Sequence, residues 1–335
     1  MTAGLPRLVG RRLVALAGVL AALTFLVFLI QAVLPTDPVK AFFGRHASPE
    51  VLAAKRAELG YDDPLPQQYV AFVGRLAEGD LGTSLRTRRP VLDDIGEFLP
   101  ATAELAVVAG AFAVAGGLAL GVVGSRRGPA ASAVRVVSVA GSSAPTFLVG
   151  IVGILIFYRS LGWLPATGRG DPVPGPTSWY LVNATLALDP AAWWDAFLHL
   201  LMPALALAIG PAVAVGRTLR GSLRDTQRDD HVRLARAKGL GEGRVLSRHS
   251  LRNAAGPALS MGGLQVGLLL AGAVVVESVF SWPGLGLYLN QAIEASDFPA
   301  VIGVVLVLGT AYVVINALVD VAQVVADPRL RSAEA

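Results

Sequence analysis

Six long apolar windows constrain the fold of this chain more than any other feature. They are Leu13–Leu34, Ala101–Gly124, Val134–Tyr158, Leu198–Leu219, Ala258–Phe280 and Pro299–Val325. Because a helix needs roughly 20 apolar residues to cross a bilayer, the windows predict an all-α integral membrane protein with six transmembrane helices. Pro203 and Pro211 interrupt the fourth window, which makes it the weakest of the six on sequence alone.

The first window has one other interpretation, a secretory signal peptide. A signal peptide has an apolar core of roughly 7–15 residues that is followed by a cleavage site of small residues. This window is longer than such a core and no such site follows it. We therefore expect the first window to be a transmembrane helix.

Composition supports the membrane class and excludes several chemistries. Only 16% of the residues are charged, against about 25% in soluble domains. The chain has no cysteine, which excludes disulfides, thiol catalysis and thiolate metal sites, and its four histidines lack the spacing of metal ligands. A phosphate-binding loop of the G-x-x-x-x-G-K-[ST] type is absent, so the sequence predicts no ATP site of that kind.

The distribution of Lys and Arg predicts the orientation in the membrane. The connection Arg217–Arg252 holds ten basic residues, whereas Leu161–Phe197 holds only Arg169 and Glu277–Phe298 holds none. Because basic loops stay on the cytoplasmic side, we expect both termini and the basic connection to be cytoplasmic. Topology thus accounts for the basic pI of about 9.7, and nucleic-acid binding is not needed to explain it.

These windows divide the chain into four parts. Residues 1–34 form the cytoplasmic N-terminus and first helix, and residues 35–100 form an extracytoplasmic helical insert. Residues 101–325 form a core of five transmembrane helices with a cytoplasmic loop at 220–257, and residues 326–335 form a cytoplasmic tail.

The insert predicts two short helices at the outer surface. Ser48 as N-cap, Pro49 in the first helical position and Gly60 as the stop define one of them. The second is amphipathic, and four residues define its apolar face: Tyr69, Phe72, Val73 and Leu76.

The basic loop predicts two helices joined by a sharp turn. Asp229 or Asp230 can cap a helix that ends at Gly239, and a second helix can start after Gly243 and continue to Pro257. The glycines at 239, 241 and 243 would allow the turn, because glycine adopts positive φ at little cost. On charge alone, the loop could equally be solvated or lie on anionic lipid.

Four polar residues fall in or near the spans: Glu104, Glu277, Asn316 and Asp320. Each is close to a predicted end, so we expect an interfacial position, because ionisable groups are costly inside a membrane. Gln265 lies deeper and could either line a passage or bond to a neighbouring helix.

Two further patterns concern helix packing and a tight turn. Gly117 with Gly121 and Gly263 with Gly267 form small-residue faces, which favour close packing within the chain over a seam between subunits. After the fifth window, "SWPGLG" predicts a turn at Pro283-Gly284 and an interfacial anchor at Trp282.

The basic loop also resembles a known family. "ARAKGL" at 235–240 followed by "RHSLRNAAGPAL" at 248–259 is similar to the cytoplasmic signature of ABC-importer permeases of the peptide/nickel type. Gly239 matches the glycine of that signature, Pro257 stands where its proline is expected, and Arg233 replaces its glutamate. The resemblance continues in order along almost the whole chain, through "GDLGTSLRTRRPVLDDIGEFLPATAELA", "PTFLVGI", "LGWLPATG", "HLLMPALALAI", "ESVFSWPGLG" and the terminal "ADPRLR".

The resemblance implies the six-helix fold of a type I ABC importer permease in a bacterial cell membrane. Such a subunit forms half of a translocation pathway for di- or oligopeptides and is not an enzyme. Its implied partners are a second homologous permease, two ATPase domains, an extracytoplasmic binding protein and the bilayer, with ATP and Mg bound only by the ATPases. A coupling helix that docks on an ATPase would comprise Val232, Leu234, Ala235, Arg236, Ala237, Lys238, Gly239 and Leu240. Pathway or gate residues would include Gln265, Glu277, Trp282, Pro283 and Gly284, and no catalytic or metal site is implied.

Other functions remain open at this point. The same type of permease carries nickel chelates, glutathione or other small solutes. An ion-driven secondary transporter is a different class, which commonly shows inverted repeats and buried carboxylate or histidine relays, and neither is evident here. A structural or receptor membrane protein is a third class.

Overall fold

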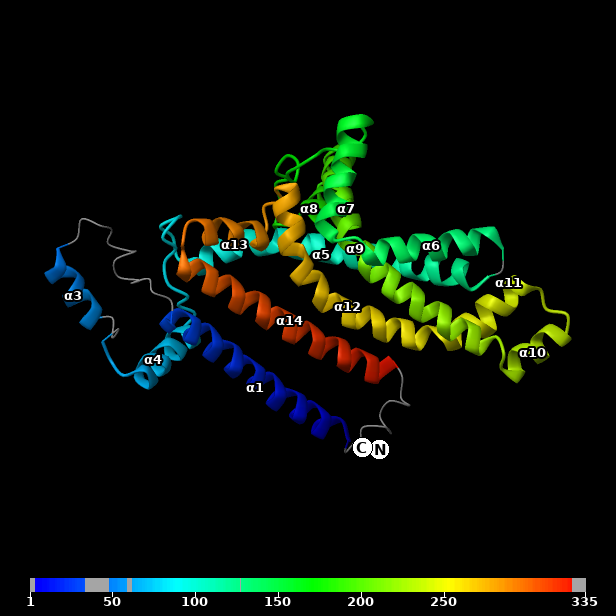
Figure 1. Ribbon diagram of the computed structural model, residues 1–335, viewed down its shortest axis with the longest axis horizontal. Coiled ribbons are helices and arrows are strands. Elements are labelled where there is room, and N and C mark those ends of the chain that lie inside the picture. The colour runs from blue at the N-terminus through cyan, green and yellow to red at the C-terminus, as the bar shows by residue number, and fades with distance from the viewer. Residues whose placement is uncertain (1–3, 34–47, 59–61, 127, 327–335) are drawn as a thin grey trace. The chain divides into compact units, whose positions relative to one another are not determined.

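The computed structural model describes residues 4–33, 48–58, 62–126 and 128–326 (Figure 1). In these ranges the chain is mostly helical, and the only β interaction is an isolated bridge between Thr83 and Pro90. The all-α prediction is therefore confirmed. The chain divides into two units, Met1–Leu99 with Leu287–Val314, and Pro100–Gly286 with Ile315–Ala335.

The first unit contains the insert helices. Its elements are α1 (Gly4–Val33), α3 (Pro49–Glu58), α4 (Leu65–Ala77), the start of α5 (Val91–Ser125), most of α13 (Leu285–Glu294) and most of α14 (Phe298–Ala326). α1 and α4 share an apolar core in which Val27, Phe28 and Phe72 pack together with Leu306 of α14.

Both predicted insert helices form. α3 begins at Pro49, and the Val51 amide lies 3.4 Å from the Ser48 hydroxyl oxygen, in the position of an N-cap bond. Gly60, the predicted stop, lies outside the described residues. On α4, Phe72 is buried and Tyr69 and Leu76 pack beside it, whereas Val73, the fourth residue of the predicted apolar face, is 38% exposed.

The second unit contains the remaining elements. They are the rest of α5, α6 (Pro129–Ser143), α7 (Thr146–Gly153), the π-helix η1 (Ile154–Ser160), α8 (Tyr180–Leu186), α9 (Pro190–Thr226), α10 (Asp230–Ala237), α11 (Glu242–Val245), the π-helix η2 (Leu246–Ser250) and α12 (Leu251–Phe280). Its main core gathers apolar residues of α5, α9 and α12.

In the part of the chain that the structure describes, four helices are long and apolar enough to cross a membrane: Val91–Ser125, Pro190–Thr226, Glu242–Phe280 and Phe298–Val319. The pair α6 and α7–η1 makes a fifth span if it is counted as one. The first predicted window lies on α1, whose described apolar part, Val14–Ile30, is shorter than a span of about 20 residues. The described residues thus support four or five spans, and six remains a prediction.

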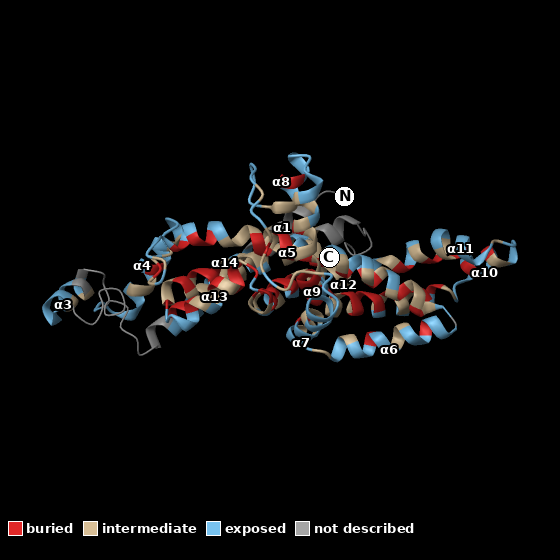
Figure 2. Ribbon diagram, turned by 90° about the horizontal axis from the view of Figure 1, so that it is seen from above, coloured by how far each residue is buried: buried red, intermediate tan, exposed pale blue. Residues whose placement is uncertain are grey.

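The fourth window, the weakest on sequence, belongs to the most buried of these helices. α9 is continuous over 37 residues with Pro203 and Pro211 inside it. Of its apolar window 61% is buried, against 22–28% in the other three helices, and Figure 2 shows the buried residues along it. Proline leaves a backbone carbonyl of its helix without a hydrogen-bond donor. Neighbouring helices can satisfy that carbonyl, so a helix surrounded by neighbours tolerates proline. Its N-terminus is capped by Asp189, whose carboxylate accepts hydrogen bonds from two backbone amides at 3.0 Å.

The third window is not one straight helix, which corrects the prediction. α6 and the following α7–η1 segment are bent by 110° (Figure 1). Pro145 causes the break, because proline disfavours helical backbone in the residue before it, and Ala144 is extended at φ −82° and ψ 127°.

The predicted close packing at Gly117 and Gly121 is confirmed within the chain. A Cβ atom added at Gly117 would lie 2.7 Å from Val215, and one at Gly121 would lie 2.7 Å from Leu219. α5 and α9 therefore approach each other more closely than larger residues would allow. Of the second pair, Gly263 is half-buried and Gly267 is buried.

Candidate functional site

The basic loop forms a short helix with a well-defined end. After α10, Gly239 adopts φ +77°, its N–H donates to the Arg236 carbonyl at 2.9 Å, and the Leu240 N–H donates to the Ala235 carbonyl at 3.3 Å. This pair of bonds is the Schellman motif, in which a glycine in the left-handed region ends a helix. The motif fixes the direction in which the chain leaves α10, and Gly239 ends the helix as predicted.

α10 has an inner and an outer face. Val232 and Ala235 are buried against Val245 of α11, and Leu240 packs on the same cluster. On the opposite side Leu234 is 56% exposed, and Ala237 and Lys238 are exposed as well. Of the residues predicted to dock, Val232 and Ala235 thus hold the helix in place, and Leu234, Ala237 and Lys238 are accessible.

Arg236 joins α10 to α11. Its guanidinium donates to the two carboxylate oxygens of Glu242 at 2.8 and 3.2 Å and to the Gln227 carbonyl at 3.3 Å. The hydrogen bond to Glu242 raises the pKa of Arg236 above its usual value. Because both side chains are partly exposed, the ion pair adds little stability. Its main effect is to fix the position of α10 against α11 through two parallel hydrogen bonds. The pairing of Arg236 with Glu242 was not predicted, because its only sign in the sequence is an acid six residues after the arginine.

The second half of the loop differs from the prediction. The helix begins at Glu242, with Gly243 inside it, and it continues through η2 into α12 and past Pro257 to Phe280. Only Gly239 of the three loop glycines has positive φ, because Gly241 serves as the N-cap of α11 at φ −64°. Glu242–Phe280 is thus one 39-residue helical segment, about 58 Å long at 1.5 Å per residue.

The other end of α12 is tightly folded. Ser281 adopts φ +48°, and the next residue, Trp282, is fully buried, with its indole N–H donating to the Ala101 carbonyl at 3.0 Å. The Gly284 N–H donates to the Trp282 carbonyl at 2.7 Å, which closes the predicted turn around Pro283. Trp282 is therefore not an interfacial anchor, because its polar atom is satisfied inside the protein.

Glu277 is also fully buried, so its carboxylate contacts protein atoms and not solvent. Its carboxylate accepts a hydrogen bond from the Gly286 N–H at 2.6 Å. A Cβ atom at Gly284 would lie 2.5 Å from this carboxylate, so a glycine is needed there for the chain to pass the acid. One backbone N–H thus takes the place of water at one oxygen of this carboxylate.

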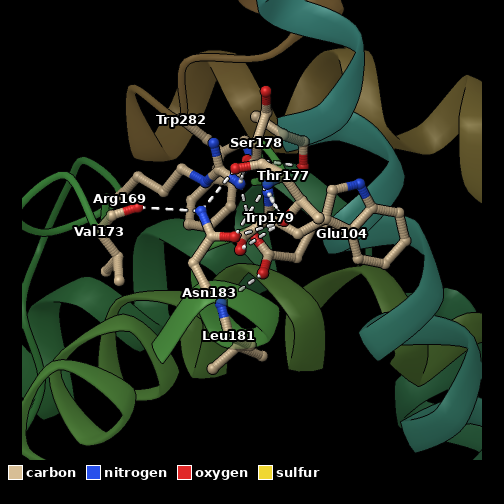
Figure 3. Close-up of polar contacts among 10 residues, drawn as sticks. Glu104, Arg169, Val173, Thr177, Ser178, Trp179, Leu181, Asn183 and Trp282 are labelled. Atoms are coloured by element: carbon tan, nitrogen blue, oxygen red, sulfur yellow. Dashed lines mark hydrogen bonds and ion pairs between the residues drawn. The ribbon is translucent and has the colours of Figure 1, made fainter. Parts of the chain in front are cut away.

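Glu104 is the second buried acid, and it has a charged partner. The Arg169 guanidinium lies 2.5 Å from one Glu104 oxygen, and it also donates to the Ser178 carbonyl at 2.7 Å (Figure 3). Its cation lies 3.9 Å from the centre of the Tyr180 ring and 5.7 Å from the Trp282 ring. Arg169 therefore joins the irregular loop before α8 to α5 and to the end of α12.

The loop is held by further polar contacts. The Leu181 N–H donates to Glu104 at 2.9 Å, and the Asn183 amide donates to the Val173 and Thr177 carbonyls at 3.0 and 2.5 Å. The sequence predicts Glu104 at the interface and indicates no role for Arg169. The one sequence feature that marks Arg169 is that it is the sole basic residue of its connection. Its pairing with Glu104 is not visible in the sequence, because the two residues are 65 positions apart.

A second buried network lies in the first unit. Asp94 accepts hydrogen bonds from Thr87 at 2.6 Å and Tyr288 at 2.8 Å, and Asp297 accepts one from Ser84 at 2.5 Å. Burial, reinforced by Asp94, raises the pKa of Tyr288, so this phenol stays protonated. These bonds hold the turn between α4 and α5, and sequence analysis identified none of the residues that form them.

The remaining candidates are less informative. The Gln265 amide nitrogen lies 3.7 Å from the Met261 sulfur of its own helix, which leaves a pathway role open. Asn316 is half-buried, and the Asp320 side chain lies outside the described residues. Within the described ranges, no three His, Cys, Asp or Glu side chains are grouped to hold a metal ion.

Comparisons with known proteins cover almost the whole chain. Residues 113–332 match the family described as the inner-membrane component of binding-protein-dependent transport systems, and residues 5–106 match its N-terminal component. The chain is 40% identical to the di/tripeptide transport system permease protein of Pseudomonas aeruginosa, over 96% of this chain and 98% of the relative. It is 38% identical to a probable D,D-dipeptide permease of Escherichia coli over 93% and 94% of the two chains. It is 37% identical to a glutathione permease of Pectobacterium atrosepticum over 96% and 97%.

Proposed function

The chain belongs to the family of inner-membrane components of binding-protein-dependent transport systems, and from this premise we propose that it forms half of the translocation pathway of an ABC importer for di- or oligopeptides. The names of its dipeptide-transporting relatives support this substrate class. The chain itself is a multi-pass membrane protein and not an enzyme. In the proposed complex, a second permease, two ATPase domains that bind ATP and Mg, and an extracytoplasmic binding protein complete the importer.

The observation that carries the coupling role is the connection of α10 to a long helix. α10 is fixed to α11 by its buried cluster and by the Arg236–Glu242 pair, and α11 continues into α12. A rigid element can transmit a displacement, which a mobile loop cannot. We propose that Leu234, Ala237 and Lys238 contact the ATPase and that its motion reaches the turn at Trp282 through α12.

The proposed topology has six spans with both termini in the cytoplasm. α1 and the bent pair α6 with α7–η1 supply the two spans beyond the four long apolar helices. The arginine-rich connections support this orientation by the positive-inside rule.

Glutathione is the second candidate substrate, because one relative of 37% identity is a glutathione permease. Glutathione is itself a small peptide, so the same pathway chemistry would serve. Binding measurements on the cognate binding protein, with dipeptides and glutathione compared, separate the two substrates.

Co-purification with the ATPase tests the coupling role. Leu234→Asp places a charge on the exposed face of α10, so we expect the chain to insert normally and to lose its ATPase in mild detergent. Leu188→Asp is the matched control, because Leu188 is 87% exposed in the turn between α8 and α9, outside the cytoplasmic loop. Equal recovery of ATPase with both variants would contradict the assignment of α10 as the docking element.

A further inference from the structure

A strongly basic hollow lies beside the cytoplasmic loop in the second unit. Its volume is about 1150 Å³, and α5, α6, α9, α10 and α11 all contribute to it. Five arginines line it, with a single acid: Arg126, Arg135, Arg224, Arg228, Arg236 and Glu242. Such a concentration of like charge is unfavourable unless an anion occupies the space.

Among the residues that the structure describes, one of these arginines, Arg236, is paired with an acid. Glu242 is engaged by Arg236, as described above. Arg135 donates to the Ser132 hydroxyl at 2.6 Å, which is a neutral partner. Within the described ranges, no carboxylate lies within ion-pair distance of the other four arginines. Guanidinium groups suit an oxyanion such as phosphate, because their planar N–H groups can bind two oxygens at once.

α6, which contributes Arg135 to the hollow, also carries exposed apolar side chains next to that arginine. Val136, Val137 and Val139 are 70%, 61% and 67% exposed, and α6 is half of the bent apolar pair (Figure 2). Exposed valines on a helix in a membrane contact acyl chains. Arg135 comes directly before these valines in the sequence. It lies about 9 Å along the helix axis from Pro129, the first residue of α6, at 1.5 Å per residue. Arginine at this depth is costly unless it reaches the headgroup layer or pairs with an anion.

We propose that this hollow binds the phosphate headgroup of an anionic phospholipid, whose acyl chains lie along the valines of α6. The charge of the hollow selects the phosphate, and the adjoining apolar helix selects a lipid over a soluble phosphate. The bound headgroup would join the start of α6 to the cytoplasmic end of α9, beside the arginine that positions α10. This lipid site goes beyond the transport role and does not depend on which solute is carried.

Native mass spectrometry of the full-length chain, delipidated in mild detergent, tests the proposal. The probes are phosphatidylglycerol and phosphatidylcholine with identical acyl chains. We expect the anionic lipid to bind about ten-fold more tightly than the zwitterionic one, and Arg135→Gln with Arg228→Gln to abolish this preference. Arg248→Gln with Arg252→Gln is the matched control, because it removes the same charge from exposed positions that do not line the hollow.

Four outcomes would overturn the proposal. The first is equal binding of the two lipids, and the second is an equal loss of the lipid preference with the control pair. The third is displacement of the lipid by equimolar inorganic phosphate or glycerol phosphate, which would make the hollow a site for free phosphate. The fourth is a variant that keeps normal lipid binding and loses ATPase co-purification, which would make the hollow a protein contact.

Discussion

At the scale of single residues, buried charge in the second unit occurs where the fold supplies a partner. Glu104 meets Arg169, and Glu277 meets the backbone N–H of Gly286. The sequence predicts both acids at the membrane interface, because their distance from the window ends is the only signal that it contains. Their partners depend on the path of the loop before α8 and on the turn after α12, which no local pattern encodes.

The Arg169–Glu104 pair gives a stability prediction. Arg169→Met leaves the Glu104 carboxylate buried without its cation, and such losses cost about 3–5 kcal/mol. We expect a lower thermal unfolding temperature in detergent, and partial recovery when Glu104→Gln is added, because the second change removes the unpaired charge. The control is Arg159→Met, at an exposed position of η1. Equal stability of Arg169→Met and Arg159→Met would contradict the role of the pair.

Gly239 gives a prediction about backbone conformation. A Cβ atom there would meet no other atom within 4 Å, so a substitution acts only through φ +77°. Left-handed backbone costs other residues roughly 1–2 kcal/mol, least for asparagine. ATP-driven uptake should therefore be highest in the unchanged protein and fall through Gly239→Asn and Gly239→Ala to Gly239→Val. Membrane insertion should be unchanged in all three variants. Full uptake by Gly239→Val would show that the exit angle of α10 is unimportant.

At the scale of elements, local signals predicted helix ends well and helix paths poorly. The N-cap at Ser48 and the stop at Gly239 followed from residue type alone. The bend at Pro145 had a local signal as well, but the apolar run across it suggested one straight helix. The start at Glu242 differed from the prediction because the fold uses Gly241 as an N-cap and needs only one glycine in the turn.

The contact between α5 and α9 tests close packing. Gly121→Ala would place a methyl group 2.7 Å from Leu219, and such overpacking costs about 1–3 kcal/mol. Gly110→Ala on the same helix is the matched control, since its methyl group would lie 3.6 Å from Leu269, an ordinary contact. There we expect no loss or a gain of about 0.5–1 kcal/mol, because alanine favours helix. Thermal unfolding in detergent measures both, and a stabilising Gly121→Ala would contradict the packing.

At the scale of the whole molecule, the family and its fold class could be predicted from sequence, because ordered motifs and apolar windows extend along the entire chain. The substrate could not, since the chain shows no feature that distinguishes a dipeptide from glutathione. The proposed coupling from α10 to the turn at Trp282 depends on contacts that the sequence does not show. α10 is fixed by two buried residues and one ion pair, and the helix that follows it reaches the buried turn at Trp282.

Uptake by the reconstituted importer tests the central claim most directly. The chain, its second permease and the two ATPases are placed in liposomes with the binding protein and a labelled dipeptide outside. We predict uptake that requires internal ATP and every component, and that a proton gradient alone does not support. Uptake by this chain alone, driven by a proton gradient without ATP, would contradict the account.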